Sequence, residues 1–150
     1  MSEAVLTRGF SEEARLLQET TQQGRKHLRS SNVLGMVSDE LWTVWEECRV
    51  PNWDGYDAMP VEQETYRNAY LFLESLPPGF PAPTIGAEPD GALTLEWRRS
   101  ARRILSVSIH PDGDLHYAAL FGPNRVCGTE AFFGDAPKPI LDLVRKVYAA

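Results

Sequence analysis

ILSVSIHPDGDLHYAALF, residues 104–121, is the stretch of this chain with the clearest structural signal. Apolar and polar residues alternate on both sides of a Pro-Asp-Gly turn at 111–113, which is typical of a β-hairpin. In such a loop proline favours the first turn position, aspartate the second and glycine the left-handed third. A three-residue loop pairs residues of equal parity, so it predicts one apolar face that combines Leu105, Val107 and Ile109 with Leu115, Tyr117, Ala119 and Phe121.

A second Pro-Asp-Gly turn, at 89–91, predicts another hairpin just before the first. The same parity argument places Ile85 and Ala87 on one face with Leu93, Leu95 and Trp97. A further strand is expected at 126–133, after a turn at 122–124. Together these segments predict an antiparallel meander of four or five strands.

Helical periodicity lies outside this strand-rich region. Helices are expected at about 11–29, 39–50, 60–76 and 139–148. We expect Ser38 and Asp135 to cap the second and the last of them, and Pro51 to end the second. The segregation of helices from strands predicts an α+β fold with N-terminal helices, a sheet covered on one face and open on the other, and a C-terminal helix. Residues 1–35 are expected to form a polar N-terminal arm or helix that can attach loosely, and residues 36–150 a single α+β domain.

Composition excludes several classes of protein. The chain has 150 residues and a net charge of −6, which disfavours general nucleic-acid binding because neutralised phosphates supply most of that affinity. Neither Cys48 nor Cys127 belongs to a C-x-x-C pair, so a zinc ribbon is excluded and buried free thiols are expected. No apolar run is long enough to span a membrane, and the first residues lack the layout of a signal peptide, so we expect a cytoplasmic protein.

The open face of the hairpin at 104–121 holds one group of candidate chemical residues. In the predicted register His110 lies opposite Asp114, and His116 is a diagonal neighbour of His110 on the same face. Two histidines and a carboxylate can hold a metal ion, and a histidine beside a carboxylate can act as a general base. The alternative is a solvated polar strand face.

The connector at 52–60 is a second candidate site. It carries two aromatic residues and two carboxylates, a set that can bind sugars, amines or peptides: Trp53, Asp54, Tyr56 and Asp57. In the alternative, Trp53 and Tyr56 fill the core while Asp54 and Gly55 form a turn.

Charge is segregated along the chain. Residues 38–64 contain eight acidic residues and one basic residue. In this region tryptophans and acidic residues are close together in the sequence. We therefore expect a partner to contact a surface formed by Trp42, Trp45, Glu46 and Glu47. The alternative is burial of the tryptophans, since a helix that is apolar on two sides is either fully buried or docked on a partner.

Four arginines surround a predicted hairpin tip: Arg98, Arg99, Arg102 and Arg103. Guanidinium groups bind phosphates and carboxylates bidentately, so this tip is a candidate contact for an acidic partner surface. Nucleic acid is a disfavoured partner because no aromatic platform accompanies the four charges. The alternative is an exposed tip whose charge prevents aggregation at the strand ends.

Two motifs resemble a family of small bacterial proteins of unknown function. They are N-W-D-G-Y-x-A-x-P-V at 52–61 and D-G-x-L-x-L-E-W at 90–97, and the likeness covers roughly residues 41–145. The resemblance implies a shared fold and brings no activity, ligand or catalytic residue.

The sequence lacks the nucleophile-elbow, P-loop, dinucleotide-binding and zinc-protease motifs, and this argues against an enzyme. We therefore predict a non-enzymatic protein-binding module without a cofactor, from a bacterial regulatory or conflict system: an antitoxin, an immunity protein, or a phage-defence or anti-defence factor. Another protein is the expected partner, and the oligomeric state is left open. The alternatives are a metal-dependent hydrolase using His110, Asp114 and His116, and a small-ligand sensor using the 52–60 loop.

Overall fold

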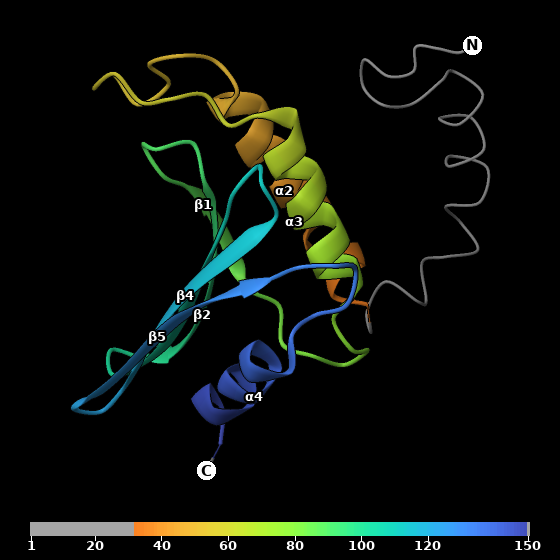
Figure 1. The fold of residues 1–150 in the computed structure, drawn as a ribbon, viewed down its shortest axis with the longest axis vertical. Helices are drawn as coiled ribbons and strands as arrows, with labels where there is room; N and C mark the ends of the chain where they lie inside the picture. The colour runs from red at the N-terminus through yellow and green to blue at the C-terminus, as the bar shows by residue number, and fades with distance from the viewer. Residues whose placement is uncertain (1–31, 150) are drawn as a thin grey trace.

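A computed structural model describes residues 32–149, and its strands form one antiparallel sheet in the order β1-β2-β3-β4-β5 (Figure 1). The elements are α2 (Val33–Cys48), α3 (Gln63–Glu74), β1 (Thr84–Ala87), β2 (Leu93–Ser100), β3 (Arg103–Ile109), β4 (Asp114–Phe121), β5 (Asn124–Ala131) and α4 (Lys138–Val147). The predicted α+β meander is confirmed, with five strands. The helix expected at 11–29 lies outside the described residues.

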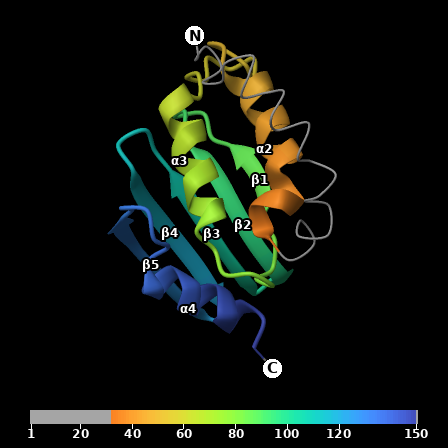
Figure 2. The same ribbon diagram turned by 90° about the vertical axis from the view of Figure 1, so that its right-hand side faces the viewer.

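The described helices all cover the same face of the sheet. Figure 2 shows α2, α3 and α4 in front of the strands. The core between these layers combines strand residues with one stripe from each helix: Leu93, Leu95, Trp97, Leu105, Val107, Ile109 and Leu115 from the sheet, and Leu41, Phe72, Leu73, Ile140 and Val144 from the helices. Within residues 32–149 no helix covers the other face, which we call the open face.

Both Pro-Asp-Gly hairpins have the predicted loop length and register. Ile109 pairs with Leu115 across the second turn, and Ile85 pairs with Leu95 beside the first. Gly113 donates its N–H to the carbonyl of His110 (3.1 Å), and its φ of +91° is the left-handed conformation that glycine adopts freely. The turn chemistry and the apolar alternation therefore agree, as they must in a stable hairpin.

Strand β5 begins two residues earlier than predicted. Phe121 pairs with Asn124, so the turn between β4 and β5 consists only of Gly122 and Pro123. This register places Cys127 opposite Ala118 on the open face, where its thiol is exposed. The expectation of two buried thiols is therefore right for Cys48, which is buried, and wrong for Cys127.

Two predicted helix caps are wrong. Helix α2 begins at Val33, and its N-cap is Asn32, whose side chain accepts a hydrogen bond from the N–H of Gly35 (3.2 Å). The extra turn is stabilised because Val33 and Leu34 are buried in the core, so packed residues occur before the predicted boundary at 35/36.

Helix α4 begins at Lys138, and no side chain caps its first turn, so Asp135 does not cap it. Pro139 lies in the first turn, where a helix loses nothing from its missing N–H.

Candidate functional site

The tryptophans of α2 belong largely to the protein interior. Trp45 is 7% exposed and donates its indole N–H to the carbonyl of Val61 (3.0 Å). Its ring stacks on Tyr66 with centroids 4.8 Å apart, and half-buried Trp42 meets both rings edge-on. Helix α2 is therefore apolar on two sides because one side packs on the sheet and the other on α3. Of the four residues predicted to contact a partner here, Glu46 and Glu47 are the two that are exposed.

Burial in this aromatic cluster affects an ionisable group. Desolvation, followed by the neighbouring Tyr70, raises the pKa of Tyr66 to about 12. The phenol is thus favoured in its neutral form, as its packing between Trp42 and Trp45 requires.

The connector between α2 and α3 is held together by its own side chains. Asp54 accepts hydrogen bonds through Oδ1 from the backbone N–H groups of Tyr56 (2.8 Å) and Ala58 (3.1 Å). Asn52 Oδ1 accepts from the N–H of Asp57 (2.6 Å), and Trp53 donates its indole N–H to the carbonyl of Met59 (2.8 Å). These bonds make the connector a compact, self-supporting loop.

This loop is also anchored to its surroundings. Val61 N–H donates to the carbonyl of Cys48 at the end of α2, and Met59 N–H donates to the carbonyl of Pro89 in the turn between β1 and β2, both at 2.8 Å. Ala58 and Val61, which belong to this connector, are themselves buried. We call residues 52–61 the tyrosine loop.

Tyr56 is the most exposed of the large hydrophobic side chains in this loop. Its side chain is 89% exposed, although the backbone that carries it is hydrogen-bonded on both sides. Two further exposed apolar side chains are Val50, which precedes the loop, and Met59, which belongs to it, and Asp57 is also exposed. Figure 1 shows the loop projecting beyond the helices at one end of the molecule.

The residues predicted to bind a small ligand therefore have different roles in the structure. The indole N–H of Trp53 and the carboxylate of Asp54 hold the loop, whereas Tyr56 faces solvent. The alternative, in which Trp53 and Tyr56 fill the core while Asp54 and Gly55 form a turn, is wrong for Tyr56, whereas Trp53 does pack against the core.

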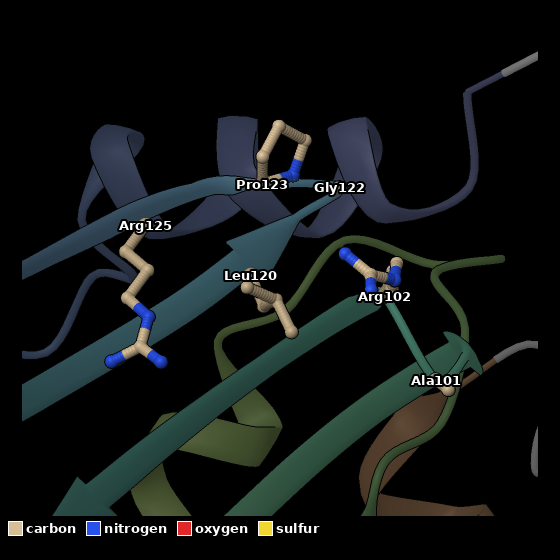
Figure 3. A pocket seen from close by; sticks show the side chains of 6 residues that line it. All are labelled: Ala101, Arg102, Leu120, Gly122, Pro123 and Arg125. Carbon is tan, nitrogen blue, oxygen red and sulfur yellow. The ribbon is translucent and has the colours of Figure 1, made fainter.

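The four arginines predicted at one tip also separate. Arg99 and Arg103 both donate to the carbonyl of Ala149, and Arg103 reaches the carbonyl of Val147 as well (3.4 Å). They thus satisfy free carbonyls at the negative end of the α4 dipole. Arg98 pairs with Glu96 (3.0 Å) on the open face, while Arg102 lines a hollow there (Figure 3). The four arginine side chains lie on different faces because side chains alternate along a strand and an irregularity between residues 98 and 100 interrupts this alternation.

His110 and His116 come together on the open face, as the register predicted. Their ring centroids are 4.7 Å apart with the rings edge to face, and His116 Nδ1 is 2.9 Å from Thr129 Oγ1. Among residues 32–149, however, no three His, Cys, Asp or Glu side chains are grouped to hold a metal ion, so Asp114 does not complete a metal site with the two histidines.

Sequence reasoning missed the residue that organises the neighbouring part of this face. Glu88 accepts hydrogen bonds from the hydroxyls of Ser108 (2.5 Å) and Thr94. The signal in the sequence is a row of polar residues. The register places Thr94, Ser108, His116 and Thr129 in this row across four strands, and its two hydroxyls nearest β1 form hydrogen bonds with Glu88. The carboxylate of Glu88 is satisfied by hydroxyl groups of β2 and β3. Glu88, Thr94 and Ser108 therefore form a structural network.

Comparison with known proteins gives no match to a family model, to a curated protein or to a solved structure. Among the described helices, none has the length and apolar character needed to cross a membrane.

Proposed function

We propose that this chain is a non-enzymatic, cytoplasmic protein-binding module of a bacterial regulatory or conflict system, and that its partner docks on the tyrosine loop. The observation that carries the proposal is Tyr56, an aromatic side chain exposed to solvent on a loop that hydrogen bonds hold in place. A side chain presented on an ordered backbone loses little entropy on binding, and tyrosine is enriched among residues that dominate interface energies.

The charge around the loop indicates the chemistry of the partner. Exposed acids lie beside it: Glu46 and Glu47 at the end of α2, Asp57 in the loop and Glu62 just after it. Asp90 is contributed by the adjoining turn between β1 and β2. We therefore propose a partner with a basic surface around an apolar recess that accepts Tyr56.

The N-W-D-G-Y-x-A-x-P-V motif supports the same interpretation. Asn52, Trp53 and Asp54 hold the loop through their side chains, and Gly55 adopts a positive φ of +79°. Tyr56 is the position of the motif that folding does not explain. We propose that the small bacterial proteins that this motif resembles share both the loop and an exposed tyrosine.

Site-specific photo-crosslinking tests the proposed surface. The full chain is prepared with benzoylphenylalanine at position 56, or at position 133 as a control, since Phe133 is also an aromatic residue that is 90% exposed. Each protein is irradiated in lysate of the native cells, with and without nuclease. We expect one protein to be crosslinked from position 56, independently of nuclease, and not from position 133. Equal labelling from both positions, or none from position 56, would contradict the proposal.

Truncation of Tyr56 gives the corresponding energetic prediction. With the captured partner purified, Tyr56→Ala should weaken binding by roughly 30-fold, because central aromatic contacts typically contribute about 2 kcal/mol or more. Phe133→Ala should bind like the unmodified chain. Equal affinities for Tyr56→Ala and the unmodified chain in a titration would show that Tyr56 is not the contact.

A further inference from the structure

The open face of the sheet carries a hollow at the end opposite to the tyrosine loop. The loop contacts the turn before β2, whereas the hollow lies beside the turn after β2. Its volume is about 450 Å³, and it is lined by Ala101, Arg102, Leu120, Gly122, Pro123 and Arg125. Figure 3 shows Arg102 and Arg125 on either side of Leu120, with α4 behind the strands.

The two arginines of this hollow differ from the other arginines of residues 32–149. Each of the others has a partner: Arg49 lies over the ring of Trp45, Arg67 pairs with Glu64, Arg98 with Glu96 and Arg145 with Asp142, and Arg99 and Arg103 bind the end of α4. Within the described residues the guanidinium groups of Arg102 and Arg125 have no ion-pair or hydrogen-bond partner.

The lining of this hollow includes two positively charged side chains and no negatively charged one, although the chain has a net charge of −6. Acidic residues outnumber basic ones, yet two guanidinium groups are left uncompensated at one hollow: that of Arg102, from the turn between β2 and β3, and that of Arg125, from β5. Glu96, an acid of the same face, is already paired with Arg98. The local potential of the hollow is therefore positive, and the groups that create it are free to form bidentate hydrogen bonds.

The floor of the hollow adds a second requirement. Leu120 lies between the two guanidinium groups, and Pro123 and Ala101 extend the non-polar lining. A bare inorganic anion would leave these groups without a contact. Ligand sites typically combine such an apolar lining with a few polar groups that fix orientation.

We propose that this hollow binds a small organic anion, in which a phosphate or carboxylate group is attached to a non-polar body. Arg102 and Arg125 hold the anionic oxygens, and Leu120 contacts the body. This site is independent of the tyrosine loop and of its protein partner.

Titration of the full chain, followed by NMR of backbone amides and arginine Nε–Hε groups, tests the site. Phenyl phosphate and phenylacetate are the probes for the two acid groups, and inorganic phosphate is the probe without a body. We expect saturable chemical-shift changes at Gly122, Arg102 and Arg125 with at least one organic probe. The probe that binds more tightly shows whether the natural ligand carries a phosphate or a carboxylate group. Arg102→Gln and Arg125→Gln should each weaken binding roughly tenfold, since each removes charge-assisted hydrogen bonds.

Matched variants separate this site from a general effect of charge. Arg67→Gln removes an exposed arginine on α3 and should leave affinity unchanged. Leu120→Ser should weaken phenyl phosphate while leaving inorganic phosphate unaffected. The proposal is overturned if neither organic probe saturates, if shifts are equal at Arg67, or if the folded glutamine variants bind like the unmodified chain. Crosslinking from position 56 should be unchanged in both glutamine variants, so each proposal can fail without the other.

Discussion

Thr65 is fully buried in α3, yet its hydroxyl has no hydrogen-bond partner within the described residues. An unsatisfied buried polar group is costly, because it gives up water and gains nothing in exchange. Thr65→Val keeps the shape of the side chain and removes the hydroxyl, so the free energy of unfolding should rise by about 1 kcal/mol. Denaturant titration measures the change. Thr129→Val, at an exposed position bonded to His116, is the control and should give no gain, and a loss of stability in Thr65→Val would refute the assignment.

Tyr66 makes a prediction about alkaline pH. Its pKa is raised to about 12 from an ordinary value of 10, so the folded state favours the neutral phenol. The resulting stabilisation is present below about pH 10 and is lost as pH rises toward 12. The absorbance of tyrosinate should be titrated in the unmodified chain and in Tyr66→Phe, and the difference isolates this one phenol. A difference signal with its midpoint near 10 would contradict the buried cluster.

At the scale of elements, the two Pro-Asp-Gly turns offer a matched comparison. Gly91 and Gly113 occupy the same turn position with nearly the same φ, +94° and +91°. A Cβ at Gly91 would lie 3.0 Å from the carbonyl oxygen of Pro60, whereas at Gly113 the nearest atom is 4.0 Å away. Gly91 is thus the place where the first hairpin closely approaches the tyrosine loop.

Alanine at these two positions should separate the cost of a positive φ from the cost of the close approach to Pro60. Gly113→Ala should cost about 1–2 kcal/mol, because an L-residue is strained in the left-handed region. Gly91→Ala should cost more, since the backbone of Pro60 must also shift. Equal losses in thermal unfolding would mean that the hairpin does not press against the loop. Only Gly91→Ala should also weaken capture of the partner.

Elements were predicted best where a local rule and burial agree. Both hairpins follow from alternation and turn residues, and the presence of α3 follows from helical spacing. The predicted start of α2 failed because Ser38 has good capping chemistry in isolation, while packing of Val33 and Leu34 extends the helix backwards. Capping contributes about 1 kcal/mol, which burial of two large apolar side chains exceeds. Helix α4 begins within one residue of its predicted start, but Asp135 does not cap it.

At the scale of the whole molecule, the two proposed binding regions lie at opposite ends of β2. The tyrosine loop is surrounded by acids, while the hollow contains two unpaired arginines. Association at the tyrosine loop should therefore depend on salt: the rate constant for association with the basic partner should fall at high ionic strength, while that for dissociation changes little.

Charge reversal localises this effect. Glu46→Lys combined with Glu47→Lys should slow association, whereas Glu74→Lys, at the far end of α3, should not. Stopped-flow measurements distinguish these outcomes, and an association rate that ignores both salt and the paired reversal would rule out a basic partner.

The sequence alone determined the α+β class, both hairpin registers and the shared face of His110 and His116, because alternation and turn chemistry act between near neighbours. Tertiary structure decided which of the candidate side chains are still available. Arg99 and Arg103 are engaged by α4, whose last carbonyls lie more than 40 residues away in sequence, and Trp45 is covered by Tyr66. Tyr56, Arg102 and Arg125 remain open because no described segment packs on them. A side chain is available for binding only when no distant element packs on it or forms hydrogen bonds with it. Contacts between distant elements leave no local pattern in the sequence.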